Sequence, residues 1–300
     1  ARQLKEELFC RGPDTQTAST EMLQSGVISM LFARLAIVGS FSEASQPAQS
    51  ENGRWRMAFN GEIYNHLNLR AQLSSDGFEC VWLGCSDTET LLAGFENWGV
   101  VETLTKCVGM FAFALWDKEN QVLTLGRDRF GEKPLYYGWS KEAFLFGSEL
   151  KAVRAFRGFS AEVSREALAQ YLRFCYVPAP LSIYESIYKL EPGCVLTITG
   201  TPPSNPPAQP VRPSETFDSL AVFRWYSFSE TVENGVSRQH GSESVALSEL
   251  ELALEEAVEL QSLADVPLGA FLSGGVDSSA IVALMQKQFS RPVKTFTIGF

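Results

Sequence analysis

The chain has 300 residues and a formal net charge of −10. This length leaves room for two domains, and 45% hydrophobic with 12% aromatic residues supplies apolar surface for a core in each. The acidic balance argues against a nucleic-acid partner, because binding a polyanion needs a basic face. No apolar run reaches the roughly 18 residues that span a bilayer, and no signal-peptide pattern is present, so we expect a cytoplasmic protein without a membrane partner.

The cysteines form no CxxC pair and too sparse a set for a disulfide framework. We expect reduced and mostly buried thiols. They are Cys10, Cys80, Cys85, Cys107, Cys175 and Cys194.

The first two thirds of the chain have the pattern of a mixed α and β domain. Short apolar runs separated by Gly, Asn and Asp predict strands of a largely antiparallel sheet system at residues 56–59, 109–116, 122–126, 135–138 and 143–146. Apolar residues at three- and four-residue spacing predict helices at residues 68–74, 88–98 and 165–174.

A proline-rich run follows at residues 200–214, GTPPSNPPAQPVRPS, with six prolines. Proline breaks helices and central strands, so the run predicts a loop or linker. Beyond it, residues 223–228 predict one more strand. Residues 244–264 predict an acidic amphipathic helix, whose apolar face is formed by Leu247, Leu250, Leu254, Ala257 and Val258.

A glycine- and serine-rich segment, LSGGVDSS at residues 272–279, lies between an apolar run at 266–271 and a helical pattern at 279–289. This order predicts a strand, a phosphate-binding loop and a helix, because glycines let backbone N–H groups converge on an anion at a helix N-terminus. No lysine ends the loop, so it is not a Walker A sequence. Asp277 stands there instead and is a candidate Mg²⁺ ligand beside bound phosphates. The alternative is a plain Gly-Ser turn.

The loop resembles the PP-loop of ATP pyrophosphatases, which cleave ATP between its α and β phosphates to form an acyl-adenylate. The resemblance implies that Leu272 and Ile298 line the adenosine. It assigns the pyrophosphate to Ser273, Gly274, Gly275, Val276, Asp277, Ser278 and Ser279.

Five motifs lie upstream: RGPD at 11–14, RLAIV at 34–38, FNGEIYN at 59–65, SDTE at 86–89 and RDRFGEKPLYY at 127–137. Taken singly, each has a simpler explanation. Asn60-Gly61 is a common hairpin-turn signal, Arg34 could be a surface residue, and Ser86-Asp87 could begin a helix.

Together and in this order, followed by the PP-loop, the motifs resemble glutamine-hydrolysing asparagine synthetases over nearly the whole chain. The resemblance implies an α+β N-terminal-nucleophile glutaminase domain, an αββα sandwich, followed by the start of an α/β PP-loop synthetase domain. We expect a glutamine amidotransferase domain at residues 1–199, a proline-rich insert and linker at 200–243, and the synthetase domain from 244 to 300.

The resemblance also implies the residues that bind glutamine. Arg34 corresponds to the clamp for its α-carboxylate, for which a planar guanidinium is suited. Asp87 corresponds to the partner of its α-ammonium. Asn60 and Gly61 correspond to the oxyanion hole. Glu62 corresponds to a residue that also contacts the glutamine.

The chain departs from the family pattern at its start. Family members begin with a nucleophilic Cys whose own α-amino group is its base. This chain begins at Ala1, so we expect the opening strand and the nucleophile to be missing and Cys10 to be a structural thiol. The sequence also stops after one β-α-β unit of the second domain, so we expect a fragment without turnover of its own. Gly39 replaces an Asp that many members carry.

The resulting hypothesis is an ATP- and Mg²⁺-dependent asparagine synthase that uses glutamine and aspartate. One alternative is an amidotransferase of the same architecture that acts on another carboxylate, in a peptide or a sugar acid. The other is a catalytically silent relative with a binding or regulatory role. The oligomeric state stays open, with a homodimer as one candidate.

Overall fold

The computed structural model describes residues 6–10, 12–23, 26–34, 46–141, 143–262 and 267–299. The described chain divides into two units, one running to Phe228 and the other beginning at Ser229. Residues 35–38 of the RLAIV motif, Gly39 and Arg11 of the RGPD motif lie outside the described residues.

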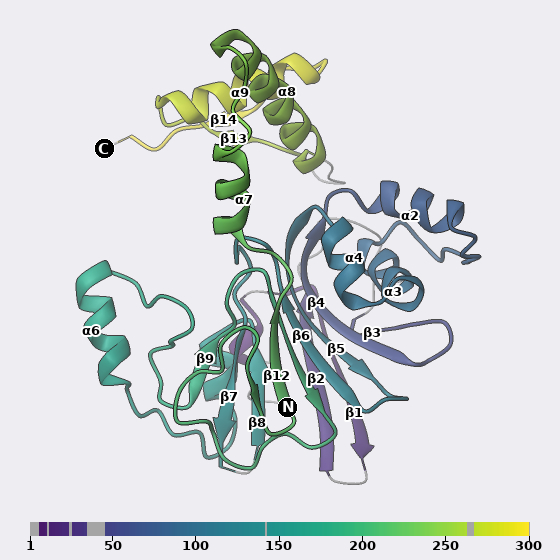
Figure 1. Cartoon of the computed structure of the whole chain (residues 1–300), viewed down its shortest axis with the longest axis vertical. Helices are drawn as coiled ribbons and strands as arrows, with labels where there is room; N and C mark the ends of the chain where they lie inside the picture. The colour runs from purple at the N-terminus through teal and green to yellow at the C-terminus, as the bar shows by residue number, and fades with distance from the viewer. Residues whose placement is uncertain are drawn as a thin grey trace. The chain divides into compact units, whose positions relative to one another are not determined.

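A seven-stranded sheet forms the centre of the first unit (Figure 1). Its two longest strands, β4 (Trp55–Ile63) and β5 (Gly109–Asp117), pair antiparallel along their whole length. The spatial order is β11 (Thr216–Phe217), β12 (Leu220–Arg224), β10 (Cys194–Thr199), β6 (Val122–Arg127), β5, β4 and β3 (Ala48–Gln49). Alternating side chains send residues from each strand to both faces, and both faces are buried.

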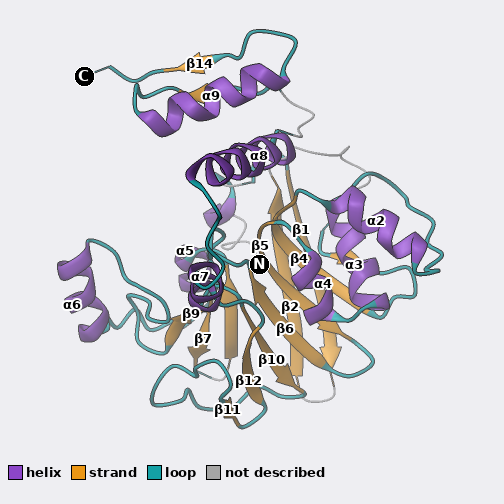
Figure 2. Cartoon of the chain, turned by 45° about the horizontal axis from the view of Figure 1, so that its top comes forward, coloured by secondary structure: helices purple, strands orange, loops and turns teal. Residues whose placement is uncertain are grey.

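Helices cover one face of this sheet and further strands cover the other (Figure 2). Met57, Phe59 and Ile63 of β4 belong to the core beneath α2 (His66–Ser75), α3 (Asp87–Asn97) and α4 (Val100–Lys106). A second core joins the opposite face to the hairpin of β1 (Thr15–Leu23) and β2 (Gly26–Arg34) and to the sheet of β7 (Tyr136–Ser140), β8 (Ala143–Gly147) and β9 (Ile187–Lys189). A short helix, α5 (Leu150–Arg154), packs on β8. The predicted αββα layering is therefore confirmed.

The strands and helices predicted before residue 175 are all present, with ends shifted by a few residues, and the helix predicted at 165–174 is α6 (Arg165–Phe174). The expectation for the cysteines was wrong in part. All six are free thiols, but only Cys107 and Cys194 are buried, and Cys10, Cys85 and Cys175 are exposed.

The proline-rich run forms a loop, as predicted, and it packs on the first unit. The indole N–H of Trp139 donates to the Pro203 carbonyl at 2.7 Å, and the Tyr188 hydroxyl donates to that of Pro207 at 3.2 Å. The chain then returns as β11 and β12, which extend the central sheet. The first unit thus continues past residue 199, the expected end of the glutaminase domain, to Phe228.

The strand predicted at 223–228 is wrong for its second half. The ladder of β12 ends at Arg224, because the N–H groups of Trp225 and Tyr226 both turn to the Gly193 carbonyl, at 2.8 and 3.2 Å. Helix α7 (Phe228–Val236) begins where the strand was expected to end.

The second unit contains one parallel β-α-β unit, as predicted. Strand β13 (Ala270–Phe271) and strand β14 (Thr295–Phe296) pair in parallel and are joined by α9 (Val276–Gln288). Helix α8 (Glu243–Gln261) packs against α9, and Lys287 of α9 pairs with Glu251 and Glu255 of α8.

The apolar face predicted for α8 is buried only toward its C-terminal end. Val258 is buried, whereas Leu247 and Leu250 are exposed. Among the described residues, no helix is both long and apolar enough to cross a membrane.

Candidate functional site

The Asn60-Gly61 pair lies inside β4 and forms no hairpin turn. Asn60 pairs with Ala112 and Gly61 with Phe111 of β5. A Cβ atom on Gly61 would lie 2.2 Å from the Met110 carbonyl oxygen and 2.6 Å from the Phe111 Cα. Glycine is therefore required here by the close approach of two strands, and the turn explanation is wrong.

The N–H of Gly61 points away from β5. Tyr64 N–H donates to Val108 O at 2.8 Å, and Lys118 N–H donates to Arg54 O at 3.0 Å. Hydrogen-bonded positions alternate along an antiparallel pair, so the even-numbered residues of β4 are the ones whose backbone bonds to β5. The odd-numbered N–H groups point to the opposite edge. There Phe59 N–H donates to the Gln46 side chain at 2.6 Å.

Farther along the same edge, Ile63 N–H donates to Asp87 Oδ2 at 2.9 Å. The Gly61 N–H, between those of Phe59 and Ile63, has no acceptor among the described residues. A backbone donor left open at such an edge is suited to stabilise a developing oxyanion.

The carboxylates of Glu62 and Asp87 lie near enough to each other for the charge of Asp87 to act on Glu62. Asp87, at the start of α3, also accepts the N–H of Thr88 at 2.7 Å. Burial raises the pKa of Asp87 above its usual value, although these N–H groups oppose the rise. Burial raises the pKa of Glu62 as well, and the nearby charge of Asp87 raises that pKa further. A neighbouring cation such as an ammonium group would favour the charged form of both carboxylates.

His66, the first residue of α2, lies near Asp87, and sequence reasoning did not identify it. Burial lowers its pKa, and the charge of Asp87 opposes this shift. Its Nδ1 atom is buried without a hydrogen-bond partner in the described part of the chain. No spacing signal marks it, because it becomes relevant only where α2 and α3 meet the end of β4.

The other predicted glutamine residues lie on the opposite face of β4 or on β2. The side-chain amide of Asn60 donates to Ser148 Oγ at 3.1 Å. Arg34 ends β2 and is buried. A Cβ on Gly12 would lie 2.4 Å from the Arg34 nitrogen, and Asp14 N–H donates to the Arg34 carbonyl at 3.1 Å, so the RGPD motif packs on the backbone of Arg34. That Arg34 faces the same bound molecule as Asp87 stays a prediction.

The RDRFGEKPLYY motif contributed only to the resemblance, but its first residues are buried in the structure. The guanidinium of Arg127 donates to the carbonyl groups of Gly131, Lys133 and Leu190 at 2.5, 2.8 and 2.6 Å. Asp128 is fully buried and accepts only backbone N–H groups in the described structure. These side chains shape the loop that borders β5.

The predicted phosphate loop lies between β13 and α9. Gly274 has φ of +82° and Gly275 caps the helix, so the loop needs the conformational freedom of glycine at its tightest point. A Cβ on Gly274 would have no neighbour within 4 Å. Ser273 Oγ and Ser278 Oγ are 3.0 Å apart, and most of the loop is exposed. The hydroxyls of Ser278 and Ser279 donate to the Gly275 carbonyl at 3.2 and 2.8 Å, and the exposed N-terminus of α9 suits a phosphate group.

Leu272 and Ile298 lie at the adjacent ends of the parallel strands. Thr297, next to Ile298, donates from its hydroxyl to the Leu272 carbonyl at 2.7 Å. Asp277 is an exposed residue in the first turn of α9. The described residues contain no group of three His, Cys, Asp or Glu side chains able to hold a metal. A single carboxylate fits Mg²⁺ only when phosphate oxygens complete the coordination.

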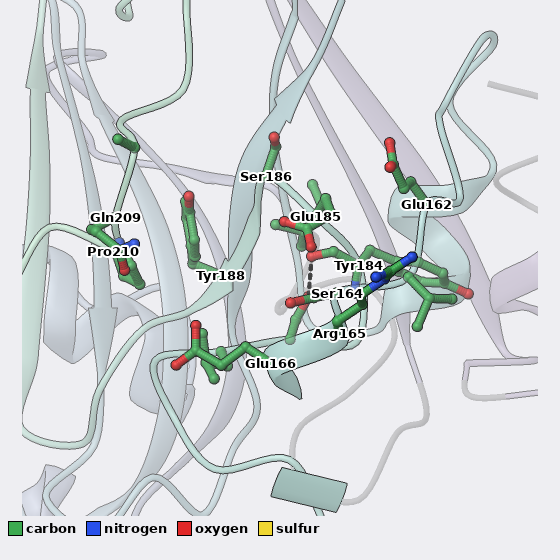
Figure 3. A pocket seen from close by; sticks show the side chains of 15 residues that line it. Glu162, Ser164, Arg165, Glu166, Tyr184, Glu185, Ser186, Tyr188, Gln209 and Pro210 are labelled. Atoms are coloured by element: carbon green, nitrogen blue, oxygen red, sulfur yellow. Dashed lines mark hydrogen bonds between the residues drawn. The ribbon is translucent and has the colours of Figure 1, made fainter. Parts of the chain in front are cut away.

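A pocket in the first unit contains none of the predicted residues. It has a volume of about 420 Å³ and lies between the start of α6, the segment around β9 and the proline-rich loop. Figure 3 shows Glu162, Arg165 and Glu166 around it. We assign it no role in the chemistry of Asn60, Gly61 and Asp87.

The first unit has the layered fold expected of a glutamine amidotransferase domain, and the second begins with the β-α-β order expected of a synthetase domain. Family models agree with this division. Residues 1–204 match the glutamine amidotransferase domain, and residues 249–300 match asparagine synthase. The chain belongs to the glutamine-hydrolysing asparagine synthetase family.

Individual relatives extend this comparison. The chain is 34% identical to asparagine synthetase [glutamine-hydrolyzing] 1 of Bacillus subtilis, over 100% of this chain and 42% of that protein. It is 28% identical to amidase chry2 of Gibberella zeae, over 98% of this chain and 41% of that protein. Among solved structures, the glutamine phosphoribosylpyrophosphate amidotransferase from B. subtilis aligns with a TM-score of 0.49 at 17% identity, over 75% of this chain and 46% of that one. The chain thus spans less than half the length of these proteins.

Proposed function

We propose that the full-length protein containing this chain hydrolyses glutamine in its first domain and uses the ammonia to form asparagine from aspartate in its second. The observation that carries the first half is the open N–H of Gly61 beside the carboxylates of Glu62 and Asp87. Glutamine needs an oxyanion donor at its side-chain amide and an anion at its α-ammonium. These groups lie together at the end of β4.

In this proposal Arg34 binds the α-carboxylate and Asp87, with Glu62, binds the α-ammonium. Asn60 and the Gly61 N–H stabilise the tetrahedral oxygen as a terminal Cys thiolate attacks the amide. Ammonia leaves, and water resolves the thioester to glutamate. The Cys is not a residue of this chain, so we expect no turnover from residues 1–300 alone.

The second domain would bind ATP at residues 272–279 and 298, with the Ser273–Ser279 loop on the pyrophosphate and Asp277 on Mg²⁺. Mg²⁺ neutralises phosphate charge when it is bound. The aspartate carboxylate would attack the α-phosphorus, and ammonia would displace AMP from the adenylate. Both intermediates gain from enclosure, because an adenylate hydrolyses in water and free ammonia is mostly protonated. Such chemistry fits a cytoplasmic enzyme.

Glutamate release from glutamine tests the first half, and aspartate-dependent ATP–pyrophosphate exchange by the full-length protein tests the second. An acid other than aspartate is the second candidate, and the similarity to amidase chry2 favours keeping it. Exchange with another carboxylic acid and none with aspartate would sink the asparagine assignment while leaving the amidotransferase assignment intact.

A further inference from the structure

At the proposed oxyanion site, β4 and β5 approach so closely that side chains cannot set their spacing. Gly61 faces Phe111 and Ile63 faces Gly109. A Cβ on Gly109 would lie 2.2 Å from the Glu62 carbonyl oxygen. A Cβ on Gly61 would lie at the same distance from the Met110 carbonyl oxygen. Interlocking side chains are therefore missing at both glycines, and backbone hydrogen bonds must hold the start of β5 in place.

Asp128 supplies those hydrogen bonds at Phe111, the residue opposite Gly61. Its carboxylate accepts the Phe111 N–H at 3.1 Å, and its own backbone N–H donates to the Phe111 carbonyl at 2.9 Å. The same carboxylate accepts the N–H groups of Phe130 and Glu132, both at 3.0 Å, and of Lys133 at 3.0 Å. One buried side chain thus ties the RDRF loop to the strand segment behind Gly61.

Arg129 holds the residues just before β5. Its guanidinium donates to the carbonyl groups of Cys107 and Thr105, the latter at 2.9 Å, and lies 5.2 Å from the centre of the Trp225 ring. On the other side, Asn65 donates to the Lys106 carbonyl at 3.0 Å and accepts the N–H of Val108 at 2.8 Å. The segment 105–108 is therefore held between the end of β4 and Arg129.

We propose that Asp128 and Arg129 are positioning residues for glutamine hydrolysis, which fix the start of β5 and thereby the direction of the Gly61 N–H. This inference rests on the proposed glutaminase function. Neither side chain needs to touch glutamine. Groups that bind the ends of the substrate, such as Asp87, are held by other contacts, so loss of Asp128 should affect the reacting amide more than substrate binding.

The test compares Asp128→Asn with Asp117→Asn in the full-length protein. Asp117 lies at the opposite end of β5, is also buried, and also accepts backbone N–H groups, from Glu119 and Asn120 at 3.0 and 3.1 Å. We expect Asp128→Asn to lower kcat for glutamate release by about tenfold or more, because small misplacements are costly in catalysis, with KM for glutamine nearly unchanged. Asp117→Asn should lower Tm and leave kcat unaltered.

Arg129→Lys provides a second variant if Asp128→Asn does not fold. Lysine keeps the charge but loses the planar fork that spans two carbonyl groups, so kcat should again fall while KM holds. An unchanged kcat in the folded variants, or an equal loss of kcat in Asp117→Asn, would overturn the proposal. A wild-type protein that releases no glutamate would refute the glutaminase function itself and this inference with it.

Discussion

The Asp87 carboxylate accepts a hydrogen bond from the Ile63 backbone N–H at 2.9 Å, which ties the start of α3 to the end of β4. This bond places a carboxylate two residues from the open N–H of Gly61. Residues 24 positions apart in the sequence thereby contribute to one proposed glutamine site.

Asp87→Asn should raise KM for glutamine about 30-fold or more in the full-length protein, because removing one partner of a buried charge pair costs several kcal/mol. Asp76→Asn is the matched control. Asp76 accepts a hydrogen bond from the Trp98 indole at 2.8 Å but lies at the far end of α2. The KM of Asp76→Asn for glutamine should therefore stay at the wild-type value. A wild-type KM in Asp87→Asn would contradict the ammonium role.

Glutamine binding should weaken as the pH falls through the raised pKa values of Glu62 and Asp87. Both carboxyl groups are disfavoured in the charged form by burial, so they take up protons above their ordinary values of 4.5 and 3.8. A neutral carboxyl group cannot pair with an ammonium. On acidification, we expect KM for glutamine to rise at a higher pH than the pH at which exposed carboxylates become protonated. Glu62→Gln should change this dependence of KM on pH.

The raised pKa values of Glu62 and Asp87 also determine the direction in which stability changes with pH. In the absence of glutamine, the folded protein binds the protons of the Glu62 and Asp87 carboxyl groups more tightly than the unfolded chain does. Their contribution to the free energy of unfolding is therefore complete below the unfolded pKa values and is lost as the pH rises through the folded ones. Denaturant unfolding of wild type and Glu62→Gln across this range measures it. A contribution from Glu62 that grew with rising pH would contradict the burial argument.

Gly61→Ala should abolish most glutamate release and lower Tm, since the added Cβ would meet the Met110 carbonyl at 2.2 Å. Gly147→Ala in β8 is the control, because a Cβ there would find its nearest neighbour at 3.7 Å, an ordinary contact. Activity and circular dichroism melting of both variants provide the measurement. Wild-type activity in Gly61→Ala would show that this part of β4 does not bind the reacting amide.

Local patterns were enough to predict the strand, glycine-rich loop and helix of the second unit and most elements of the first. The strand, glycine-rich turn and helix of the second unit are contiguous in sequence, and a loop at Gly274 follows from residue type alone. Asn60-Gly61 shows the limit of such reasoning. Alone it resembles a turn, and only its pairing with residues 50 positions downstream makes it part of a strand.

The rest of the site depends on contacts that no local pattern encodes. The open Gly61 N–H is visible only once the pairing alternation and the neighbouring acceptors, Gln46 and Asp87, are known. Asp128 belongs to a charged motif, and only the structure shows that backbone N–H groups satisfy its carboxylate inside the fold. A strand near β12 was predicted, but its place in the central sheet was not, because prolines interrupt the chain before it.

The two proposed sites should be separable by a substitution in the phosphate loop. Asp277→Ala removes an exposed carboxylate from the first turn of α9, so it should cost little stability but abolish aspartate-dependent ATP–pyrophosphate exchange in the full-length protein. Glutamate release should persist, because every group proposed to bind glutamine lies in the other unit. Glu256→Ala, another exposed acidic residue of the second unit, should leave both activities intact. Equal loss of both activities in Asp277→Ala would mean that the glutamine site depends on the ATP site, contrary to the two-site proposal.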